Sequence, residues 1–261
     1  MEFAGGKILA EIDGAAGWLI VNQPERMNAV NYEMWQAIPQ ALAWLGAHDA
    51  LRAIVLRGAG DRAFAAGADI SEFDEVRCDS RTNAVFTEAV TQATSSLLEF
   101  PAPVIAMISG YCIGGGMVLS SACDLRICDD GSQFGVPAAK LGLAYELDNY
   151  ARLSRIVGSG FAQELLFTGR KFSAAEALAM RFVNRVVAPA ELEGTIAGYL
   201  DDIRQNAPLT LAAAKLSERS VRDASLSGDA QRAIDACFDS EDFKEGRQAF
   251  QAKRSPRFVG R

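Results

Sequence analysis

Three consecutive glycines, Gly114 to Gly116, separate two apolar segments within the stretch VIAMISGYCIGGGMVLSSACDLRIC (104–128). The segment before them, VIAMISG (104–110), has the composition of a buried strand, and GGMVLSSAC (115–123) that of a short buried helix. Ordered glycine costs backbone entropy, so three together indicate a tight turn or a close approach of backbones. Such a turn directs the unpaired N–H groups of a helix N-terminus toward one point. Ligand binding and tight helix–sheet packing explain the glycines equally well.

A second loop of small residues favours ligand binding. The segment DRAFAAGADISEF (61–73) places Ala-Ala-Gly-Ala between a strand and a helix, and only Asp69 among residues 66 to 69 carries an ionisable group. Two such loops, each following a buried strand, can each offer one N–H group to a shared oxygen. This arrangement is an oxyanion hole, in which each donor contributes roughly 3–4 kcal/mol when charge develops on a carbonyl oxygen.

The hydrophobic pattern changes along the chain from alternating strands and helices to helices alone. We expect an α/β core over residues 1–187 and a helical C-terminal module over 188–261. Asn31 is expected to cap the first long helix, and Ser173 with Glu176 forms a capping-box pattern. The expected strands cover 7–13, 17–23, 52–58, 104–110 and 124–129, the expected core helices 31–47 and 82–100, and the expected C-terminal helices 191–207, 208–224 and 228–254.

Charge and composition exclude several functional classes. The formal net charge is −7 and there is no Lys/Arg cluster, so neither nucleic acid nor an anionic membrane is expected as the main partner. The single histidine, His48, falls at a helix end, which removes Ser-His-Asp, Cys-His and histidine-based zinc chemistry. The five cysteines form no C-x-x-C pair, and the N-terminus lacks a signal-peptide pattern. We therefore expect a cytoplasmic protein with no metal or redox cofactor.

Four motifs in order resemble the crotonase (enoyl-CoA hydratase/isomerase) superfamily, and the similarity runs from about residue 7 to the end of the chain. The resemblance implies an α/β fold, a spiral of ββα units with a helical C-terminal trimerisation module, and a homotrimer or homohexamer. It also implies acyl-CoA thioester substrates, whose CoA would be the only cofactor-like group. The motifs are FAAGADISEF (64–73), AMISGYCIGGGMVLSSACDLRIC (106–128), FTGRKFSAAEALAMRFVNRVV (167–187) and SEDFKEGRQAFQAKRSPRF (240–258).

The resemblance assigns roles to positions in these motifs. The oxyanion-hole donors would be the backbone N–H groups of Ala68 and Gly115, with Gly114 beside them. Lys253 matches a basic residue that often reaches the CoA phosphates of a neighbouring subunit. Residues matching the CoA-binding segments are Arg26 and Met27 along the CoA arm, and Ala66, Gly67, Asp69 and Ile70 around the nucleotide.

The sequence departs from the family's hydratases at both catalytic acids. Those enzymes carry two glutamates where this chain has Val118 and Ala138. Two carboxylates that hold one water molecule are needed for syn-hydration, and neither valine nor alanine can hold or move a proton. The usual hydratase mechanism is therefore not expected.

Other polar residues lie nearby in the segment AKLGLAYELDNYARLSRIVG (139–158). Glu146 falls four residues after Gly142, where the family's dienoyl-CoA isomerases carry a catalytic aspartate. We expect Glu146 to act as a base on a thioester and Tyr145 and Asp148 to contribute to the same site. The alternative for both acids is a structural role at a helix N-terminus, where negative charge is favoured by ~0.3–1 kcal/mol.

Four functions remain open on this basis. Double-bond isomerisation with Glu146 as the base leads. A hydratase that uses Glu146 and Asp148 in an unusual geometry is the nearest alternative. Decarboxylation of a malonyl-type CoA needs the oxyanion hole and a donor such as Tyr145 but no strong base. A catalytically silent CoA-binding protein would retain the loops without the acids.

Overall fold

A seven-stranded mixed sheet forms the centre of the computed structural model, which describes residues 1–69, 72 and 76–261. The pairs β1–β2 and β2–β3 are antiparallel, and all pairs from β3 to β11 are parallel. The strand order is β1 (Glu2–Phe3), β2 (Ile8–Asp13), β3 (Ala16–Val21), β4 (Ala53–Gly58), β6 (Val104–Ile108), β8 (Leu125–Asp129) and β11 (Arg185–Val187).

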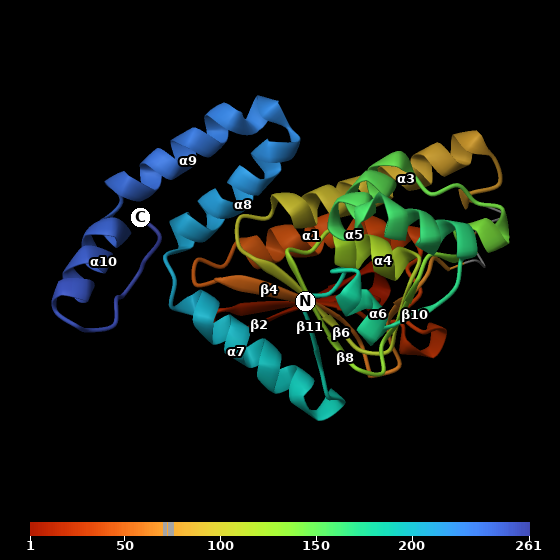
Figure 1. The fold of residues 1–261 in the computed structure, drawn as a ribbon, viewed down its shortest axis with the longest axis horizontal. Helices are drawn as coiled ribbons and strands as arrows, with labels where there is room; N and C mark the ends of the chain where they lie inside the picture. Colours follow the sequence, from red (N-terminus) through yellow and green to blue (C-terminus); the bar gives the residue numbers. More distant parts are fainter. Residues whose placement is uncertain (70–71, 73–75) are drawn as a thin grey trace.

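Both faces of this sheet are covered, as expected for parallel strands that are apolar throughout. Alternate residues of β4 point to opposite faces: Ile54 joins the core under α1 (Tyr32–Gly46) and α3 (Ser80–Glu99), whereas Val55 packs with α7 (Leu192–Arg204). Figure 1 shows α1 and α3 on one side of the strands and α7 on the other. The continuous apolar runs in the sequence therefore reflect burial on two sides.

A second, four-stranded sheet makes the fold a spiral of ββα units. Each of β4, β6 and β8 in the large sheet is followed by a strand of the small sheet and then by a helix, α3, α4 (Gly115–Ser121) or α5 (Leu147–Thr168). This is the α/β arrangement that the sequence predicts. The small sheet has the order β10 (Phe172–Ser173), β9 (Gln133–Gly135), β7 (Tyr111–Ile113) and β5 (Ala63–Ala66).

Local capping follows the sequence. The Asn31 side chain accepts a hydrogen bond from the Met34 N–H at 2.9 Å and begins α1. Ser173 and Glu176 form the reciprocal capping box of α6 (Ala174–Ala179). Each bond satisfies a donor that the first turn of a helix leaves unpaired.

The C-terminal helices differ from expectation in one respect. The sequence predicts one helix over 228–254, but the structure has two, α9 (Ser227–Asp239) and α10 (Glu241–Gln251). Ser240 has extended backbone angles, and its hydroxyl accepts from the Phe243 N–H at 3.0 Å, which caps a new helix. Together with α8 (Pro208–Arg222), these helices extend to one side of the sheets (Figure 1).

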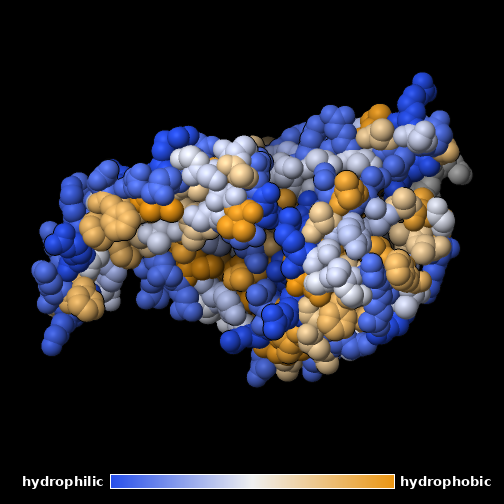
Figure 2. Space-filling view, turned by 45° about the horizontal axis from the view of Figure 1, so that its top comes forward, coloured by the Kyte–Doolittle hydropathy of each residue, from blue (hydrophilic) through white to orange (hydrophobic). Residues whose placement is uncertain are grey.

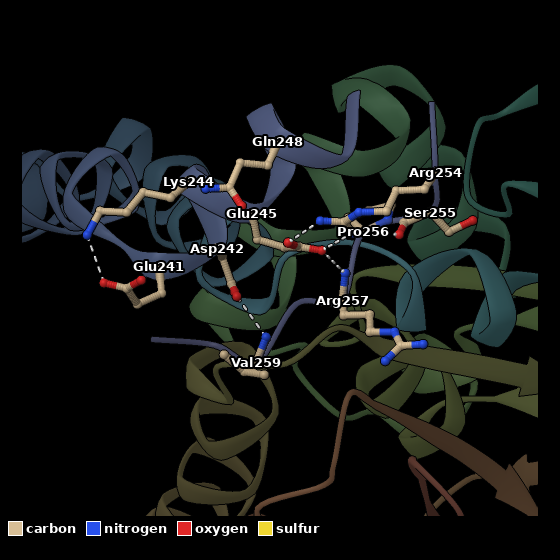
Figure 3. A pocket seen from close by; sticks show the side chains of 10 residues that line it. All are labelled: Glu241, Asp242, Lys244, Glu245, Gln248, Arg254, Ser255, Pro256, Arg257 and Val259. Atoms are coloured by element: carbon tan, nitrogen blue, oxygen red, sulfur yellow. Dashed lines mark hydrogen bonds and ion pairs between the residues drawn. The ribbon is translucent and has the colours of Figure 1, made fainter. Parts of the chain in front are cut away.

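The last residues of the chain fold back onto α10. The Glu245 carboxylate accepts two bonds from the Arg254 guanidinium, at 2.6 and 2.8 Å, and one from the Arg257 N–H at 2.8 Å. Asp242 accepts from the N–H groups of Val259 and Gly260. Figure 3 shows these side chains around a surface hollow between α10 and the tail. The tail is thus held by two carboxylates of one helix.

Apolar helices of membrane-spanning length are not found among the described residues. The long helices α3 and α5 are amphipathic, with buried positions such as Phe86 and Leu153 on one face. Their apolar faces pack onto the protein core.

Candidate active site

The two glycine-containing loops meet in the structure. A Cβ placed on Gly115 would lie 3.0 Å from the Gly67 carbonyl oxygen, and one on Gly114 would lie 3.4 Å from the Gly67 Cα. Gly114 has φ 51° and ψ −104°, a conformation that side-chain-bearing residues rarely adopt. The glycines therefore allow a turn and a close approach of backbones at the start of α4.

The backbone around Ala68 turns its N–H group away from the neighbouring chain segment. The Gly67 carbonyl accepts from the Val30 N–H at 3.0 Å, and the Asp69 N–H donates to the Val30 carbonyl at 3.3 Å. In an extended chain successive peptide groups point to opposite sides, so the Ala68 N–H points away from Val30. Gly115 is the first residue of α4, and its N–H has no acceptor within the helix.

Both loops line one pocket with a volume of about 210 Å³. Ala68, Gly115 and Glu146 all lie on its wall, as do Val118 and Ala138. The rest of the lining is largely apolar, with Trp35, Phe86, Val90, Ile113, Val136, Leu141 and Leu143. The structure therefore brings the expected backbone donors and the expected base into a single, mostly apolar cavity.

Glu146 is the one carboxylate that lines this pocket in the described part of the chain. Its Oε1 atom accepts hydrogen bonds from Asn83 Nδ2 at 3.0 Å and from the Thr87 hydroxyl at 3.1 Å. Glu146 precedes the first residue of α5, but its side chain makes no capping bond to that helix. Its carboxylate is thus held by α3 across the pocket rather than by its own helix.

A cation lies one hydrogen bond further along. Arg77 Nε donates to Asn83 Oδ1 at 2.9 Å, so the amide of Asn83 joins the guanidinium to the Glu146 carboxylate. Burial lowers the pKa of Arg77, and the charge of Glu146 partly offsets this effect. Sequence reasoning missed Arg77, which lies before α3, and Asn83 and Thr87, which lie on α3. Polar residues on and beside an amphipathic helix carry no signal of a contact about 60 residues away.

The Tyr145 hydroxyl is buried and has no hydrogen-bond partner among the described residues. Desolvation by burial raises the pKa of Tyr145 above its ordinary value, so the hydroxyl remains protonated. The ring lines the same pocket as Glu146. A protonated, unpaired hydroxyl at this position can donate to an oxygen of a bound molecule.

Three predicted CoA-binding residues, Arg26, Met27 and Asp69, are not among the residues on the pocket wall. Arg26 Nη1 and Asp69 Oδ2 form an ion pair at 2.6 Å, and the Met27 carbonyl accepts from the Ala66 N–H at 3.0 Å. Residues 26 and 27 are therefore fastened to the loop that carries Ala68. Ala66, Gly67 and Gly114 line the pocket itself.

The remaining predicted positions are not part of the cavity. Asp148 is exposed in the first turn of α5, where the helix dipole favours a carboxylate. Lys253 is exposed just after α10. Neither side chain is among the described residues on the pocket wall. Ile70 lies outside the described residues.

The cysteines near the site are buried and unreactive. Burial raises the pKa of the Cys112 thiol to about 12 and that of Cys123 to about 12. A thiolate, not a thiol, is the effective nucleophile, so neither residue supplies one at neutral pH. Both are small buried residues.

Comparison with known proteins assigns the chain to a family. The sequence model of the family Enoyl-CoA hydratase/isomerase matches residues 13–261. This chain belongs to the enoyl-CoA hydratase/isomerase family. It is 34% identical to the Short-chain-enoyl-CoA hydratase of Clostridium acetobutylicum, over 95% of both chains. It is 33% identical to the Crotonyl-CoA hydratase of Syntrophomonas wolfei, over 97% of this chain and 98% of the other.

Solved structures of the enoyl-CoA hydratase/isomerase family share the fold. An enoyl-CoA hydratase/carnithine racemase from Magnetospirillum magneticum superposes with a TM-score of 0.92, at 34% identity, over 98% of this chain and 96% of the other. A family protein from Hyphomonas neptunium gives a TM-score of 0.92 at 35% identity, over 98% of each chain. The spiral of ββα units is therefore the crotonase fold, as the sequence predicts.

Within this enoyl-CoA hydratase/isomerase fold, Val118 and Ala138 occupy the positions at which the motif resemblance implies catalytic glutamates. Both lie on the wall of the pocket that holds Glu146. Val118, a residue of α4, is 6% exposed and belongs to the hydrophobic core. The pocket thus keeps the backbone donors and presents methyl groups at both positions.

Proposed function

We propose that the protein is an acyl-CoA double-bond isomerase that stabilises a thioester enolate and uses Glu146 as its base. One observation carries the proposal: among the described residues of the pocket, Glu146 is the single carboxylate, and it lines the same pocket as Ala68 and Gly115. A 1,3-proton shift needs one acid–base group, whereas hydration by two acids needs a second carboxylate.

The proposed reaction begins with the thioester carbonyl oxygen between the N–H groups of Ala68 and Gly115. Glu146 removes a proton from the α-carbon of a β,γ-unsaturated acyl group, and the electron pair moves onto the carbonyl oxygen as a dienolate. The two N–H groups stabilise this oxyanion by roughly 3–4 kcal/mol each. The protonated Glu146 then returns the proton to the γ-carbon, which leaves the α,β-unsaturated thioester.

Asn83 and Thr87 would hold the Glu146 carboxylate in this step. Both bonds reach Oε1, so the second oxygen, Oε2, is not engaged by either donor. The apolar walls at Val118 and Ala138 would exclude a water molecule that competes for the dienolate. Because only protons move, the reaction requires no metal or redox cofactor besides the CoA carried by the substrate.

Hydration is a second candidate, favoured by the relatives. Two relatives with 33–34% identity are named as hydratases, one of short-chain enoyl-CoA and one of crotonyl-CoA. A hydratase of this chain would have to use Glu146 alone to activate water and to deliver the proton. The two candidates predict different products from the same bound thioester.

The deciding experiment incubates the purified protein with 3-hexenoyl-CoA and, separately, with 2-hexenoyl-CoA. We expect the first to yield the conjugated 2-enoyl thioester and the second to yield little 3-hydroxyacyl product, both followed by chromatography and mass spectrometry. Glu146→Gln should lower the isomerisation kcat about 10²–10⁴-fold. Asp148→Asn, which removes an exposed acid nearby, is the matched control and should stay near the unsubstituted rate.

Three results would contradict the proposal. Rapid formation of 3-hydroxyacyl-CoA that requires Glu146 would support hydration instead. Unchanged isomerisation in Glu146→Gln would remove this residue as the base. Binding of acyl-CoA without turnover, including on a malonyl-type thioester, would indicate a silent binding protein.

A further inference from the structure

A second cavity, of about 310 Å³, lies between β8, α5 and α8. None of the residues on its wall lines the acyl pocket. Basic residues on the wall of this cavity outnumber the two carboxylates, Asp124 and Glu218. The described wall is therefore strongly cationic, although the chain has a net charge of −7. The basic residues on the wall are Arg126, Arg152, Arg155, Lys215, Arg219 and Arg222.

Lys215 has a structural role within this wall. Its Nζ atom lies 2.7 Å from Asp124 Oδ2 and donates to the carbonyls of Leu97 and Ala102 at 3.2 and 3.3 Å. These three acceptors use all three ammonium donors. The bonds of Lys215 fasten α8 to the end of α3. Because Lys215 and Asp124 neutralise each other, neither charge is available to a ligand.

Two further ion pairs involve Glu218, the other carboxylate of the wall, and Glu99, which lies outside the cavity. Arg219 pairs with Glu99 at 3.1 Å, and Arg222 Nη2 pairs with Glu218 at 2.6 Å. The Arg222 Nε atom is buried and has no hydrogen-bond partner among the described residues. A buried guanidinium donor without an acceptor is costly, and an acceptor inside the cavity would satisfy it.

The Arg126 side chain is hydrogen-bonded to backbone carbonyls and forms no ion pair with a described carboxylate. Its guanidinium donates to the carbonyls of Phe182, Ser120 and Cys123 at 2.6, 3.2 and 2.7 Å. These bonds hold the side chain in the core but provide no negative charge. Its positive charge therefore adds to the potential of the cavity.

Arg152 and Arg155 form no ion pair with any described carboxylate. Arg152 is 7% exposed and donates only to Asn149 Oδ1 and the Thr94 hydroxyl, at 3.2 and 3.3 Å. Burial lowers the pKa of both arginines, and nearby positive charges lower it further: Arg155 and Arg222 act on Arg152, and Arg222 acts on Arg155. Tyr145 and Asp148 oppose this effect at Arg152, and Glu218 opposes it at Arg155. The guanidinium groups of Arg152, Arg155 and Arg222 therefore repel one another.

We propose that this cavity binds a phosphate-class oxyanion, held by Arg152, Arg155 and Arg222. A tetrahedral dianion presents several acceptor oxygens and compensates the repulsion among three guanidinium groups. It also provides an acceptor for the unpaired Arg222 Nε. A volume of 310 Å³ accommodates such an ion with its hydration, or the phosphate group of a larger molecule.

The test uses inorganic phosphate as the probe on the full-length protein, by titration calorimetry and by thermal unfolding at constant ionic strength. We expect one binding site in the unsubstituted protein and a rise in the unfolding midpoint of roughly 2–4 °C at saturating phosphate. Arg155→Gln and Arg222→Gln should weaken binding at least tenfold. Arg185→Gln, the same change at an exposed arginine outside the cavity, is the control and should retain binding.

Phosphate also stabilises proteins in general through its exclusion from their surface. An equal midpoint rise in Arg155→Gln and in the unsubstituted protein would therefore overturn the proposal, as would the absence of a saturable heat. Repeating the titration with adenosine 5′-monophosphate distinguishes the source of the phosphate. Tighter binding than phosphate, lost in Arg155→Gln, would assign the site to a nucleotide; weaker binding would assign it to the free ion.

A charge reversal gives an independent readout. In phosphate-free buffer, Arg155→Glu places a carboxylate beside Arg152 and Arg222 and should raise the unfolding midpoint. Arg185→Glu should not raise it. A lower midpoint in Arg155→Glu than in Arg185→Glu would show that the cavity has no excess positive charge and would overturn the proposal.

Discussion

Thr87 donates a hydrogen bond from its hydroxyl to the Glu146 carboxylate at 3.1 Å, which joins α3 to the residue that precedes α5. Asn83, one turn earlier on α3, donates to the same oxygen at 3.0 Å. Two donors from one rigid helix fix the Glu146 carboxylate at the pocket. No other carboxylate among the described residues lines this pocket. The position of the proposed base therefore depends on the packing of α3.

This relationship predicts the effect of removing both donors. In Asn83→Ala/Thr87→Val the carboxylate loses its fixed orientation, and we expect kcat for the proposed isomerisation to fall about 10–100-fold with a smaller change in KM. The single variant Thr87→Val should lower kcat in the same direction. Thr87→Ser keeps the hydroxyl and should retain most of the kcat that Thr87→Val loses. Steady-state kinetics on 3-hexenoyl-CoA measures this. A change in KM alone would assign Asn83 and Thr87 to substrate binding instead.

The contact between the loops predicts that Gly115→Ala impairs the site more than the fold. The added Cβ would lie 3.0 Å from the Gly67 carbonyl oxygen and would separate the loops that carry the two N–H donors. We expect kcat/KM to fall about 10–100-fold. Gly194→Ala in α7, where nothing lies within 4 Å, is the control and should stabilise the protein by up to about 1 kcal/mol. Unchanged kcat/KM in Gly115→Ala would argue against this donor.

The buried Tyr145 hydroxyl predicts an unusual stability effect. Because this group lacks a hydrogen-bond partner among the described residues, Tyr145→Phe should raise the free energy of unfolding by about 1 kcal/mol. Tyr32→Phe removes a hydroxyl that accepts from Gln36 at 3.1 Å, so it should give no gain. Urea denaturation measures both variants. Destabilisation of Tyr145→Phe by more than 1 kcal/mol would mean that the hydroxyl has a partner in solution.

The clasp between α10 and the tail predicts a pH dependence. Hydrogen bonds from the Arg254 side chain and then from the Arg257 N–H hold the pKa of Glu245 at about 2, below its ordinary value of 4.5. A lowered pKa favours the clasped form above pH 4.5, and this contribution declines as the pH falls from about 4.5 to 2. Hydrogen exchange of residues 254–261 should be faster in Glu245→Gln than in the unsubstituted protein at pH 7. The difference should vanish near pH 2; a constant difference would contradict the assignment.

The exposed aromatic residues of the C-terminal helices predict self-association. Phe250 is 86% and Phe238 63% exposed, next to an apolar groove between α8, α9 and α10. Figure 2 shows hydrophobic side chains on this extended arm. We expect a native mass three or six times 28.0 kDa by light scattering. Phe250→Asp should shift it toward the monomer, and Gln251→Asp on the same helix should not. A monomeric unsubstituted protein would refute the prediction.

The sequence alone determined the features that depend on local backbone requirements. The glycine loops, the strands before them and the caps at Asn31 and Ser173 follow from residues close together in the chain, because glycine conformation and helix capping are local effects. The replacement of two implied acids by Val118 and Ala138 was equally visible. These observations were enough to expect the fold and the oxyanion-hole loops.

Only the tertiary structure decided which side chains meet. Asn83 and Glu146 are 63 residues apart, and the arginines of the second cavity come from β8, α5 and α8. Their contacts depend on how α3, α5 and α8 pack, and the pattern of one amphipathic helix does not encode its neighbour's polar residues. The break at Ser240 belongs here too: the helical pattern continues through it, whereas the chain turns there and its end is bound by Asp242 and Glu245.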